Sequence, residues 1–324
     1  MTLYPLQLTR RYESRLWGGN TLATWLGVSD APTPLAETWE VYNDNHISNG
    51  PLAGATLRAV ATQYGATLLG ARSFARYGGE FPLLAKFIDA AQPLSVQVHP
   101  DDTYAHTHEA ASGFHGKTEA WHILATQPDS DIIHGLIHPI TRQAYAEAIA
   151  QGRLEPLLRR VAVHAGDTVF VPAGTIHAIN AGIMLFEIQQ TSDLTYRVYD
   201  YNRRDASGAL RALHVDQAIA VSDLGTAATV PTPAVPRAPG YTELVRSEFF
   251  VMDRMESAQP TEWQQPADSF QIVTMIAGTA AYIHDGTTIT LPRGASLIIP
   301  ACITTSTLIP QGSATWLRCW VPPA

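Results

Sequence analysis

The stretch Gly166-Asp-Thr-Val-Phe-Val-Pro172 indicates the fold, because its pattern returns at Gly294-Ala-Ser-Leu-Ile-Ile-Pro300. Each copy has a glycine, two small or polar residues, three apolar residues and a proline, which is typical of a turn followed by a short buried strand. One turn and one strand are weak evidence for a repeat. The apolar segment Phe270–Gly278 could be the counterpart of Glu119–Ala125 further upstream. If so, the chain contains two copies of one β-barrel unit.

The composition around these segments is typical of a mainly β protein. The 324 residues include 23 glycines and 22 prolines, with many short β-branched runs between them. Apolar residues follow helical spacing in a few places, and we predict helices over Thr56–Leu69, Thr141–Val161 and His214–Leu224. The sequence therefore predicts a mainly β fold with a few helices.

Metal-ligand types occur at strand spacing upstream of the first copy. The run from Pro93 to His99 reads as a short buried strand that ends at Pro100. Successive side chains of a strand alternate between faces, so Gln97 and His99 project to the same side. His177 follows a further predicted strand and a tight turn, and is a second candidate imidazole ligand.

Another strand is predicted to begin at Glu119. In this strand His122 points away from the face that carries the carboxylate. That face is formed by Lys117, Glu119, Trp121 and Ile123. A carboxylate and a lysine can therefore face the same cavity as Gln97 and His99.

Two imidazoles, one carboxylate and one amide oxygen suit zinc, and also iron, manganese or nickel. Taken singly, a histidine at a strand end is more often a hydrogen-bonded core or rim residue, and a strand glutamate is usually solvated. The agreement of the strand phases favours ligation. The other histidines of this region are poorly phased, and we expect surface or rim positions for His106, His108, His115, His122, His134 and His138. Of these, His115 and His122 stay weak site candidates.

The composition excludes several classes of protein. Hydrophobic residues make up 46% of the chain and charged residues 15%, which is typical of a soluble globular protein, and no apolar run reaches the 18 or so residues that span a bilayer. The segment Met1–Leu6 lacks the basic and apolar regions of a signal peptide. Cys302 and Cys319 are too few for a disulfide framework or a cysteine metal site. We expect a cytoplasmic protein that does not bind membranes.

The formal net charge of −8 argues against general nucleic-acid binding, because neutralising phosphates needs a basic surface. It leaves room for a small basic pocket that binds a single phosphate. We expect a small-molecule partner and a monomer or small homo-oligomer.

Several segments together resemble the type I mannose-6-phosphate isomerases of the cupin superfamily, particularly the shorter bacterial forms. The resemblance implies a pair of cupin-type jelly-roll barrels, and the combination of segments is highly specific. The matching segments run through most of the chain: Trp17–Gly19, Ala36–Val41, Phe81–Ala90, Leu94–Asp102, Gly116–Trp121, Val171–Ala178 and Glu187–Arg197.

This resemblance implies one divalent metal ion, with zinc preferred, and the interconversion of mannose-6-phosphate and fructose-6-phosphate through an enediol-type intermediate. The family's active-site lysine and arginine fall on Lys117 and Arg197. Its metal ligands fall on Gln97, His99, Glu119 and His177.

The resemblance also suggests roles for the charged residues. Lys117 is the candidate catalytic base and a substrate contact. Arg197 is expected to hold the phosphate or an anionic transition state, because guanidinium suits planar anion recognition. Glu187 is a secondary acid/base candidate and substrate contact. Without the resemblance, Lys117 and Arg197 read as solvated surface charges.

The domain organisation follows from the internal repeat and from the composition of the segment between its two copies. We predict an N-terminal catalytic cupin domain with helical insertions at 1–224, a Pro/Ala-rich linker at 225–240, and a degenerate C-terminal cupin domain at 241–324. Thr305 follows Pro300 at the distance at which His177 follows Pro172. The second copy is therefore expected to be metal-free and mainly structural.

Three other functions fit parts of the pattern. A sugar-binding or regulatory cupin would keep the fold without turnover. A non-haem iron dioxygenase would use two histidines and one carboxylate, although Gln97 would then occupy a position that oxygen chemistry needs open. An isomerase acting on a different sugar or sugar phosphate would keep the chemistry.

Overall fold

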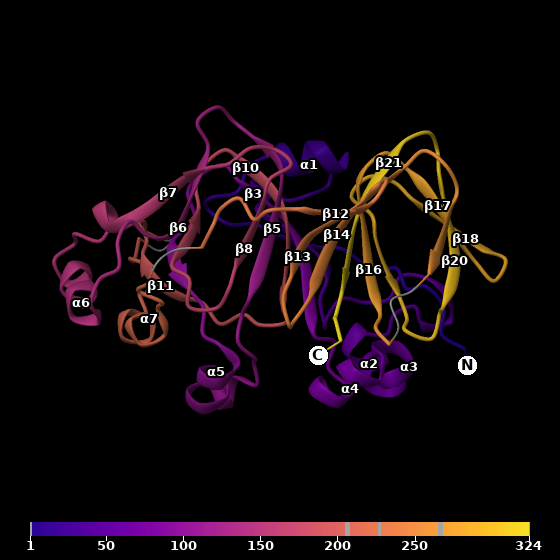
Figure 1. The fold of residues 1–324 in the computed structure, drawn as a ribbon, viewed down its shortest axis with the longest axis horizontal. Helices are drawn as coiled ribbons and strands as arrows, with labels where there is room; N and C mark the ends of the chain where they lie inside the picture. The colour runs from indigo at the N-terminus through magenta and orange to yellow at the C-terminus, as the bar shows by residue number, and fades with distance from the viewer. Residues whose placement is uncertain (1, 205–207, 226–227, 265–267, 324) are drawn as a thin grey trace. The chain divides into compact units, whose positions relative to one another are not determined.

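The structure is a computed structural model that describes residues 2–204, 208–225, 228–264 and 268–323 (Figure 1). Within these ranges the chain consists mainly of strands, with short helices between them. The described strands form four sheets. The predicted mainly β fold with a few helices is confirmed.

The chain divides into two compact units, each assembled from separate segments. The central unit combines Tyr12–Thr38 with Phe87–Pro233. The C-terminal unit combines the chain up to Arg11 with Trp39–Lys86 and with the chain from Ala234 onward. These units contain other residue ranges than the predicted domains 1–224 and 241–324. The division into those two domains stays a prediction.

The predicted linker at 225–240 is not uniform. Residues 226–227 of it lie outside the described residues. Residues Val235–Ala238 form strand β12, which pairs with β13 (Tyr241–Arg246). That part of the segment therefore belongs to a sheet.

The strands between Arg11 and Tyr199 form two sheets. The larger has the order β1 (Arg11–Glu13), β2 (Glu37–Val41), β3 (Leu83–Ala90), β10 (Ile183–Gln190), β5 (Glu119–Thr126) and β8 (Thr168–Val171). The smaller has the order β11 (Tyr196–Tyr199), β4 (Val96–Val98), β9 (His177–Ile179), β6 (Asp131–Leu136) and β7 (Leu158–Ala162).

Two apolar clusters hold the central unit together. The first includes Trp121 and Ile123 of β5 and Val169 of β8. The second includes Val96 and Val98 of β4. Each fully buried side chain of this size contributes about 1.5–3 kcal/mol to folding. Because the two valines belong to the second cluster, the residue between them faces the other way.

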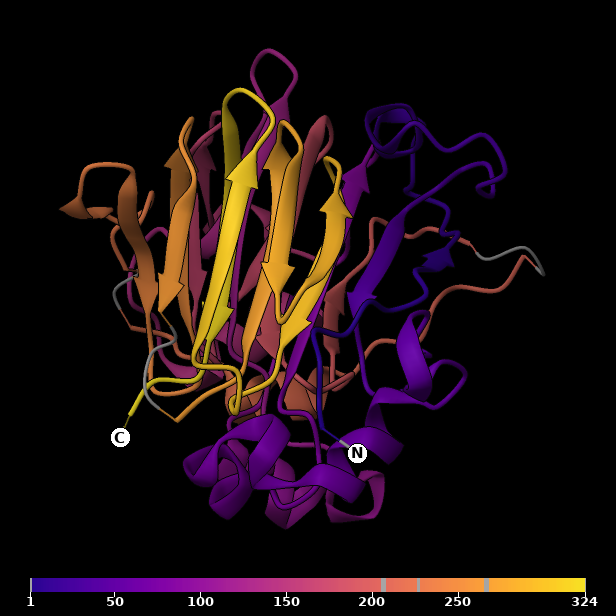
Figure 2. The ribbon, with the colours of Figure 1, turned by 90° about the vertical axis from the view of Figure 1, so that its right-hand side faces the viewer.

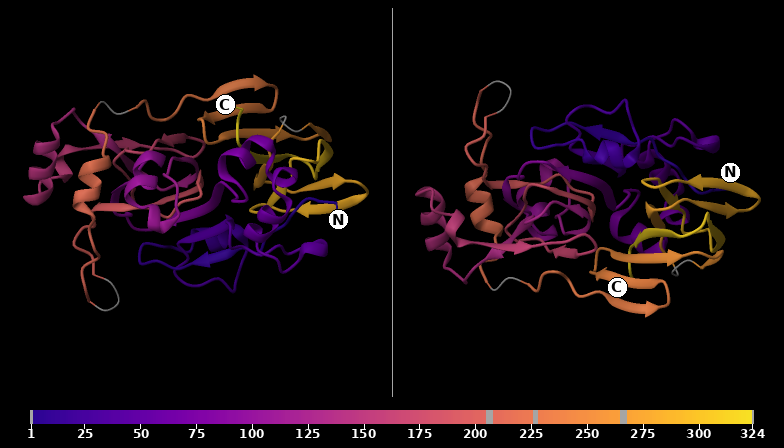
Figure 3. Two further views of the ribbon diagram at one scale, coloured as in Figure 1. Left: turned by 90° about the horizontal axis from the view of Figure 1, so that it is seen from below. Right: turned by 90° about the horizontal axis from the view of Figure 1, so that it is seen from above.

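Two helices cover the face of the smaller sheet that carries the second cluster. Tyr145 of α6 (Arg142–Ala150) and Ala218 of α7 (Val215–Val221) both belong to that cluster. The two helices lie side by side, as both views of Figure 3 show. One face of β4, β9 and β11 is thus packed against helices, and the opposite face is left for the site.

The predicted helix over Thr141–Val161 is wrong in its second half. The helix begins after Thr141, whose hydroxyl accepts a hydrogen bond from the Ala144 amide, and ends at Ala150. Gly152 has a φ of +63°, which stops the helix, and β7 pairs with β6 beyond it. Strand pairing over long sequence distance outweighs local helix propensity here.

The predictions of the other two helices hold with shorter bounds. The segment Thr56–Leu69 forms α2 (Leu57–Tyr64) and α3 (Ala66–Leu69), and the third predicted helix forms α7. None of the helices in the described ranges is long and apolar enough to cross a membrane. The remaining helical elements are α1 (Thr21–Leu26), α4 (Ala71–Tyr77), α5 (Asp102–His108) and three short 3₁₀ turns (Gly50–Leu52, Ala110–Ser112 and Glu155–Leu157).

The strands after Val235 form the other two sheets. Figure 2 shows the four-stranded sheet in orange and yellow, with neighbouring arrows antiparallel. Its order is β15 (Thr261–Gln264), β20 (Thr305–Pro310), β17 (Ala280–His284) and β18 (Thr287–Leu291). The six-stranded sheet has the order β12, β13, β14 (Val251–Ser257), β21 (Ala314–Trp320), β16 (Gln271–Ala277) and β19 (Ser296–Ile299).

The repeat in the sequence is also a repeat of strand pairing. β8 pairs with β5 and β5 with β10, while β19 pairs with β16 and β16 with β21. The register matches too, because Glu119 lies opposite Val171 and Gln271 lies opposite Ile299. The prediction of two related β units is confirmed, and Gln271 stands at the position that corresponds to Glu119.

Backbone hydrogen bonds explain why early segments belong to the C-terminal unit. Leu6 and Ile298 exchange two of them, at 2.8 and 2.9 Å. The Leu68 carbonyl at the end of α3 accepts a hydrogen bond from the Ala301 amide at 2.9 Å. These pairings satisfy buried backbone groups over long sequence distance.

One glycine at the start of α4 is required by a close approach. Gly70 has a φ of +86°, and a Cβ there would collide with the Asp268 carbonyl. We expect Gly70→Ala to lower the free energy of unfolding by at least about 2 kcal/mol, because backbone strain and the collision add. Urea denaturation measures the change.

Gly78→Ala is the matched control, because Gly78 has a φ of +61° and no atom within 4 Å of the added Cβ. It should cost less than Gly70→Ala. Equal losses would show that the contact with Asp268 adds nothing.

Candidate metal centre

Cross-strand register brings three predicted site residues onto one face of the smaller sheet. Gln97 of β4 lies directly opposite His177 of β9 on one side and Arg197 of β11 on the other. Directly opposite residues of an antiparallel pair point to the same face. Their neighbours Val98 and Ala178 pack in the helix-covered cluster. The three polar side chains therefore face away from the helices.

The first residue of β5 contributes the carboxylate. Glu119 shares its face with Trp121 and Ile123, which belong to the first apolar cluster. His122 faces the other way, where its Nδ1 lies 3.0 Å from the Thr168 hydroxyl. The alternation predicted for this strand is confirmed.

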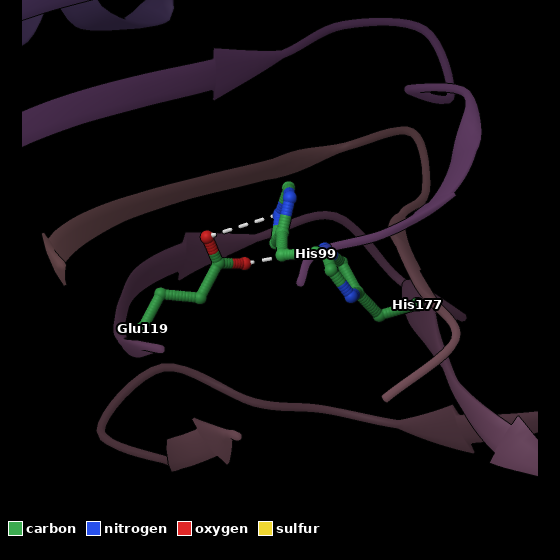
Figure 4. A group of neighbouring side chains, drawn as sticks. All are labelled: His99, Glu119 and His177. Atoms are coloured by element: carbon green, nitrogen blue, oxygen red, sulfur yellow. Dashed lines mark ion pairs between the residues drawn. The ribbon is translucent and has the colours of Figure 1, made fainter. Parts of the chain in front are cut away.

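His99, Glu119 and His177 form one compact group. One ligand atom from each lies within 4.8 Å of the others, and each residue is 1% exposed. Figure 4 shows the carboxylate facing both rings, with dashed lines to them. Glu119 Oε2 lies 3.5 Å from His99 Nε2, and Glu119 Oε1 lies 3.2 Å from His177 Nε2.

Backbone carbonyls determine the tautomers of both imidazoles. His99 Nδ1 lies 2.8 Å from the Leu194 carbonyl, and His177 Nδ1 lies 2.8 Å from the Thr175 carbonyl. A carbonyl only accepts hydrogen bonds, so each Nδ1 carries the proton. Each Nε2 then presents a lone pair toward Glu119, which is how a histidine ligand is commonly oriented.

Burial keeps both rings neutral at pH 7. It lowers the pKa of His177 to about 3. Burial and then the positive charge of Lys117 also lower the pKa of His99. Neutral imidazoles are the form that binds a metal, so no proton has to leave these rings at neutral pH.

The carboxylate is charged and short of hydrogen-bond donors. Burial acts to raise the pKa of Glu119, but the positive charge of Lys117 holds it well below its usual range. Lys117 Nζ lies 3.0 Å from Glu119 Oε2. Apart from this ion pair, neither oxygen of Glu119 accepts a hydrogen bond within the described ranges, and His99 Nε2 has no hydrogen-bond partner there either. Buried donor atoms left in this state fit a divalent cation.

Gln97 can complete the donor set. Its Nε2 lies 3.3 Å from His177 Nε2, so its amide already reaches the group. A cation on the His177 lone pair would remove the acceptor of that contact. Rotating the amide by half a turn would then present its oxygen as a ligand, since the two ends of the amide are nearly isosteric.

The other predicted site residues lie around this group. Lys117 is 6% exposed and contacts Glu119 directly. Arg197 lies beside Gln97 and is partly exposed. Glu187 of β10 lies opposite Trp121, which follows Glu119 by two residues on β5. Its Oε2 accepts a hydrogen bond from the Trp121 indole at 3.0 Å. The reading of Lys117 as a solvated surface charge is therefore wrong.

Two of the remaining histidines are not surface or rim residues. His122 is 2% exposed and His134 is fully buried, so the expectation is wrong for both. His134 lies opposite His177, and its Nε2 lies 3.0 Å from the Phe170 carbonyl. The sequence analysis did not place His134 beside the site. It could have been found from the period of two along β6, which puts His134 on the same face as the apolar Ile132.

His115 lies apart from the group. Its ring Nδ1 lies 2.9 Å from Nε2 of His106, an exposed residue of α5. Neither His115 nor His122 belongs to the group of metal-ligand atoms found within the described chain.

The second copy differs at the corresponding positions. Gln271 stands where Glu119 does, and Thr305, opposite Gln264, stands where His177 lies opposite Gln97. A carboxylate and an imidazole are thus replaced by an amide and a hydroxyl. That the second copy is metal-free remains a prediction.

Family models and a relative of known sequence match this chain, and all are described as phosphomannose or mannose-6-phosphate isomerases. Residues 5–122 match the family described as "Phosphomannose isomerase type I, catalytic domain", and residues 241–317 match "Mannose-6-phosphate isomerase, cupin domain". A relative in Bacillus subtilis, the probable mannose-6-phosphate isomerase GmuF, is 35% identical over 305 residues, which cover 92% of this chain and 94% of that protein.

Solved structures agree with the sequence comparisons. The crystal structure of the mannose 6-phosphate isomerase from Bacillus subtilis has a TM-score of 0.86 and 31% identity, covering 97% of this chain and 99% of that chain. A mannose 6-phosphate isomerase described as the holo, zinc-bound form has a TM-score of 0.79 and 18% identity, covering 98% and 100% of the two chains. At that identity the second likeness is evidence for the fold alone.

Proposed function

The chain belongs to the type I mannose-6-phosphate isomerases, a cupin family, and from this premise we propose that it interconverts mannose-6-phosphate and fructose-6-phosphate at a divalent metal. The observation that carries the proposal is the buried group formed by His99, Glu119 and His177. Its donor atoms point at one another, and His99 Nε2 and the Glu119 oxygens lack hydrogen-bond partners within the described ranges, which a purely structural core does not leave uncompensated.

We assign the metal to zinc. Two neutral imidazoles, one carboxylate and one amide oxygen make a donor set that suits zinc chemistry. A mannose 6-phosphate isomerase of the same fold is described as zinc bound, and this proposal takes the same metal for the chain. The ligands in this proposal are Gln97, His99, Glu119 and His177.

The reaction moves a hydrogen between C1 and C2 of the open-chain sugar, and its obstacle is the weak acidity of the carbon next to the carbonyl. When bound, a divalent cation supplies Lewis-acid polarisation of that carbonyl and stabilises the developing enediolate charge. The protein's own residues must orient the sugar, exclude water and carry the proton.

Lys117 is our proposed proton carrier. It is buried next to the group and contacts Glu119 at 3.0 Å, so its amine is held in place. The like charge of a bound cation would favour the uncharged amine, which would take the proton from one carbon, and the resulting ammonium would return it to the other. Glu187 is a second acid/base candidate and substrate contact; the Trp121 indole holds one of its oxygens.

Arg197 is our proposed contact for the substrate's anionic groups. It lies next to Gln97 across β4 and β11, so it adjoins the proposed ligands. Its guanidinium carries a positive charge at every relevant pH, and it suits a phosphate or an enediolate.

Turnover separates this proposal from the sugar-binding alternative. In an assay coupled to fructose-6-phosphate consumption, we expect the protein to convert mannose-6-phosphate, and to convert unphosphorylated mannose far more slowly. Binding of mannose-6-phosphate without turnover would favour a regulatory sugar-binding protein. Faster turnover of another sugar phosphate would keep the reaction and change the substrate.

Metal analysis separates the isomerase from an iron oxygenase. Protein purified without added metal should contain one equivalent of zinc per chain by mass spectrometry. Dialysis against a chelator should abolish turnover, and zinc should restore it. Iron as the resident metal, together with oxygen consumption, would contradict the proposal.

A further inference from the structure

Arg197 is held at the edge of the proposed metal centre by two contacts. Its Nε lies 3.3 Å from the Ser95 hydroxyl, and its Nη1 donates to the Ala212 carbonyl at 2.9 Å. Ser95 and Gln97 share a face of the segment that leads into β4. The guanidinium therefore extends along this segment, away from the proposed ligand Gln97.

A second arginine is fixed nearby by a buried carboxylate. Asp200 is 5% exposed, and its Oδ1 lies 3.3 Å from Arg211 Nη1 and accepts a hydrogen bond from Arg203 Nη2. Arg203 also donates to the Pro93 carbonyl at 2.5 Å. Asp200 and Arg203 thus connect the segment that carries Arg211 to Pro93, in the segment that precedes β4.

The cluster carries an excess of positive charge. Burial lowers the pKa of Arg197, and the positive charge of Arg211 is the next largest cause. Asp200 and Arg203 are the other charged groups that act on it. These described residues comprise three guanidinium groups and one carboxylate, and Arg203 and Arg211 contact that carboxylate, so two positive charges remain. A phosphate monoester dianion would balance them.

The donors of the cluster are not all used. Arg203 donates through three of its nitrogens, which is typical of a structural role. Arg211 differs, because within the described ranges only its Nη1 has a hydrogen-bond partner. Its other nitrogens remain able to donate to an anion.

The two arginines are placed for a substrate whose charged group lies at the opposite end from the group that meets the metal. His99 and Gln97 mark the metal end, and Ser95, whose hydroxyl lies 3.3 Å from Arg197 Nε, precedes Gln97 by two residues. Each step of two residues covers about 6.6 Å. The open chain of a hexose phosphate spans a distance of that order, with its carbonyl and its phosphate at opposite ends.

We infer that Arg211 binds the phosphate group of the substrate together with Arg197. This inference rests on the proposed function and adds a residue that determines specificity for phosphorylated sugars. Asp200 orients Arg211. Without a phosphate-binding role, Arg211 would be half of a partly exposed ion pair, which contributes little to stability.

The test is Arg211→Ala. The KM for mannose-6-phosphate should rise about 10- to 100-fold, as expected for the loss of charge-assisted hydrogen bonds, while kcat stays close to that of the parent protein. The inhibition constant of inorganic phosphate should rise by a similar factor. The kcat/KM for unphosphorylated mannose should not change, and Arg211→Lys should recover part of the loss.

Arg204→Ala is the control. Arg204 belongs to the same segment, but it is exposed and donates to the Gly208 carbonyl. Its replacement should leave all of these constants unchanged. An equal loss of kcat/KM for mannose and mannose-6-phosphate in Arg211→Ala would overturn the inference, because it would indicate a structural role.

A readout without turnover keeps this inference separate from the proposed function. Titration of inorganic phosphate, followed by ³¹P NMR line width, should show binding to the parent protein and weaker binding to Arg211→Ala. If the parent protein isomerises no sugar phosphate, the proposed function fails. The titration would still show whether Arg211 binds phosphate. Equal phosphate binding by the two proteins overturns the role of Arg211.

Discussion

Glu119→Gln is expected to remove the bound metal and to lower kcat/KM by about 10³-fold or more. The Lewis-acid contribution of a catalytic metal is several kcal/mol, and each 1.4 kcal/mol is a factor of ten. The amide has the same shape but no charge, so two neutral imidazoles would face the cation alone. Mass spectrometry of the purified variant measures the metal, and the coupled assay measures turnover.

The fold should tolerate this change. Gln271 occupies the corresponding buried position in the second copy, where it accepts a hydrogen bond from the Trp263 indole at 2.9 Å. Glu187→Gln is a matched control for metal content, because Glu187 is an equally buried acid on the same face. It should keep one metal per chain. A Glu119→Gln variant with full metal content and full turnover would show that the metal-site proposal is wrong.

Lys117→Ala is expected to lower kcat by about 10²- to 10⁴-fold while the metal stays bound, the range for loss of a positioned acid/base group. Glu119 would lose its 3.0 Å contact with the ammonium. The cation and two imidazoles would still face the carboxylate, so the donor set would persist. Steady-state kinetics and metal analysis of the same preparation separate the two effects.

Chemical rescue sharpens this second test. The truncated side chain leaves a buried space next to Glu119, and small primary amines should enter it and restore part of kcat. A variant that loses its metal would instead point to a role of Lys117 in maintaining the site. Unchanged kcat would exclude Lys117 as the proton carrier.

The sequence alone predicts which side chains of a strand share a face. Trp121 and Glu119 face the interior and His122 faces away, as the period of two requires. Gln97 is separated from the helix-covered valines by the same rule. This prediction succeeds because alternation is a property of the local backbone.

The sequence does not predict which residues lie opposite one another on neighbouring strands. That His134 lies opposite His177, and Gln97 opposite both His177 and Arg197, depends on register between segments far apart in the chain. No periodic signal in either segment encodes that register. The helix predicted to run to Val161 failed for the same reason, because β7 is stabilised by its pairing with β6.

The amino-acid sequence alone determined that this protein is mainly β, that it repeats one strand unit, and which side chains share a face within each strand. These properties follow from backbone geometry over a few residues. Only the tertiary structure decided which faces meet and which early segments join the C-terminal unit. Those outcomes are set by hydrogen bonds and packing between residues distant in the chain, and no local pattern specifies them.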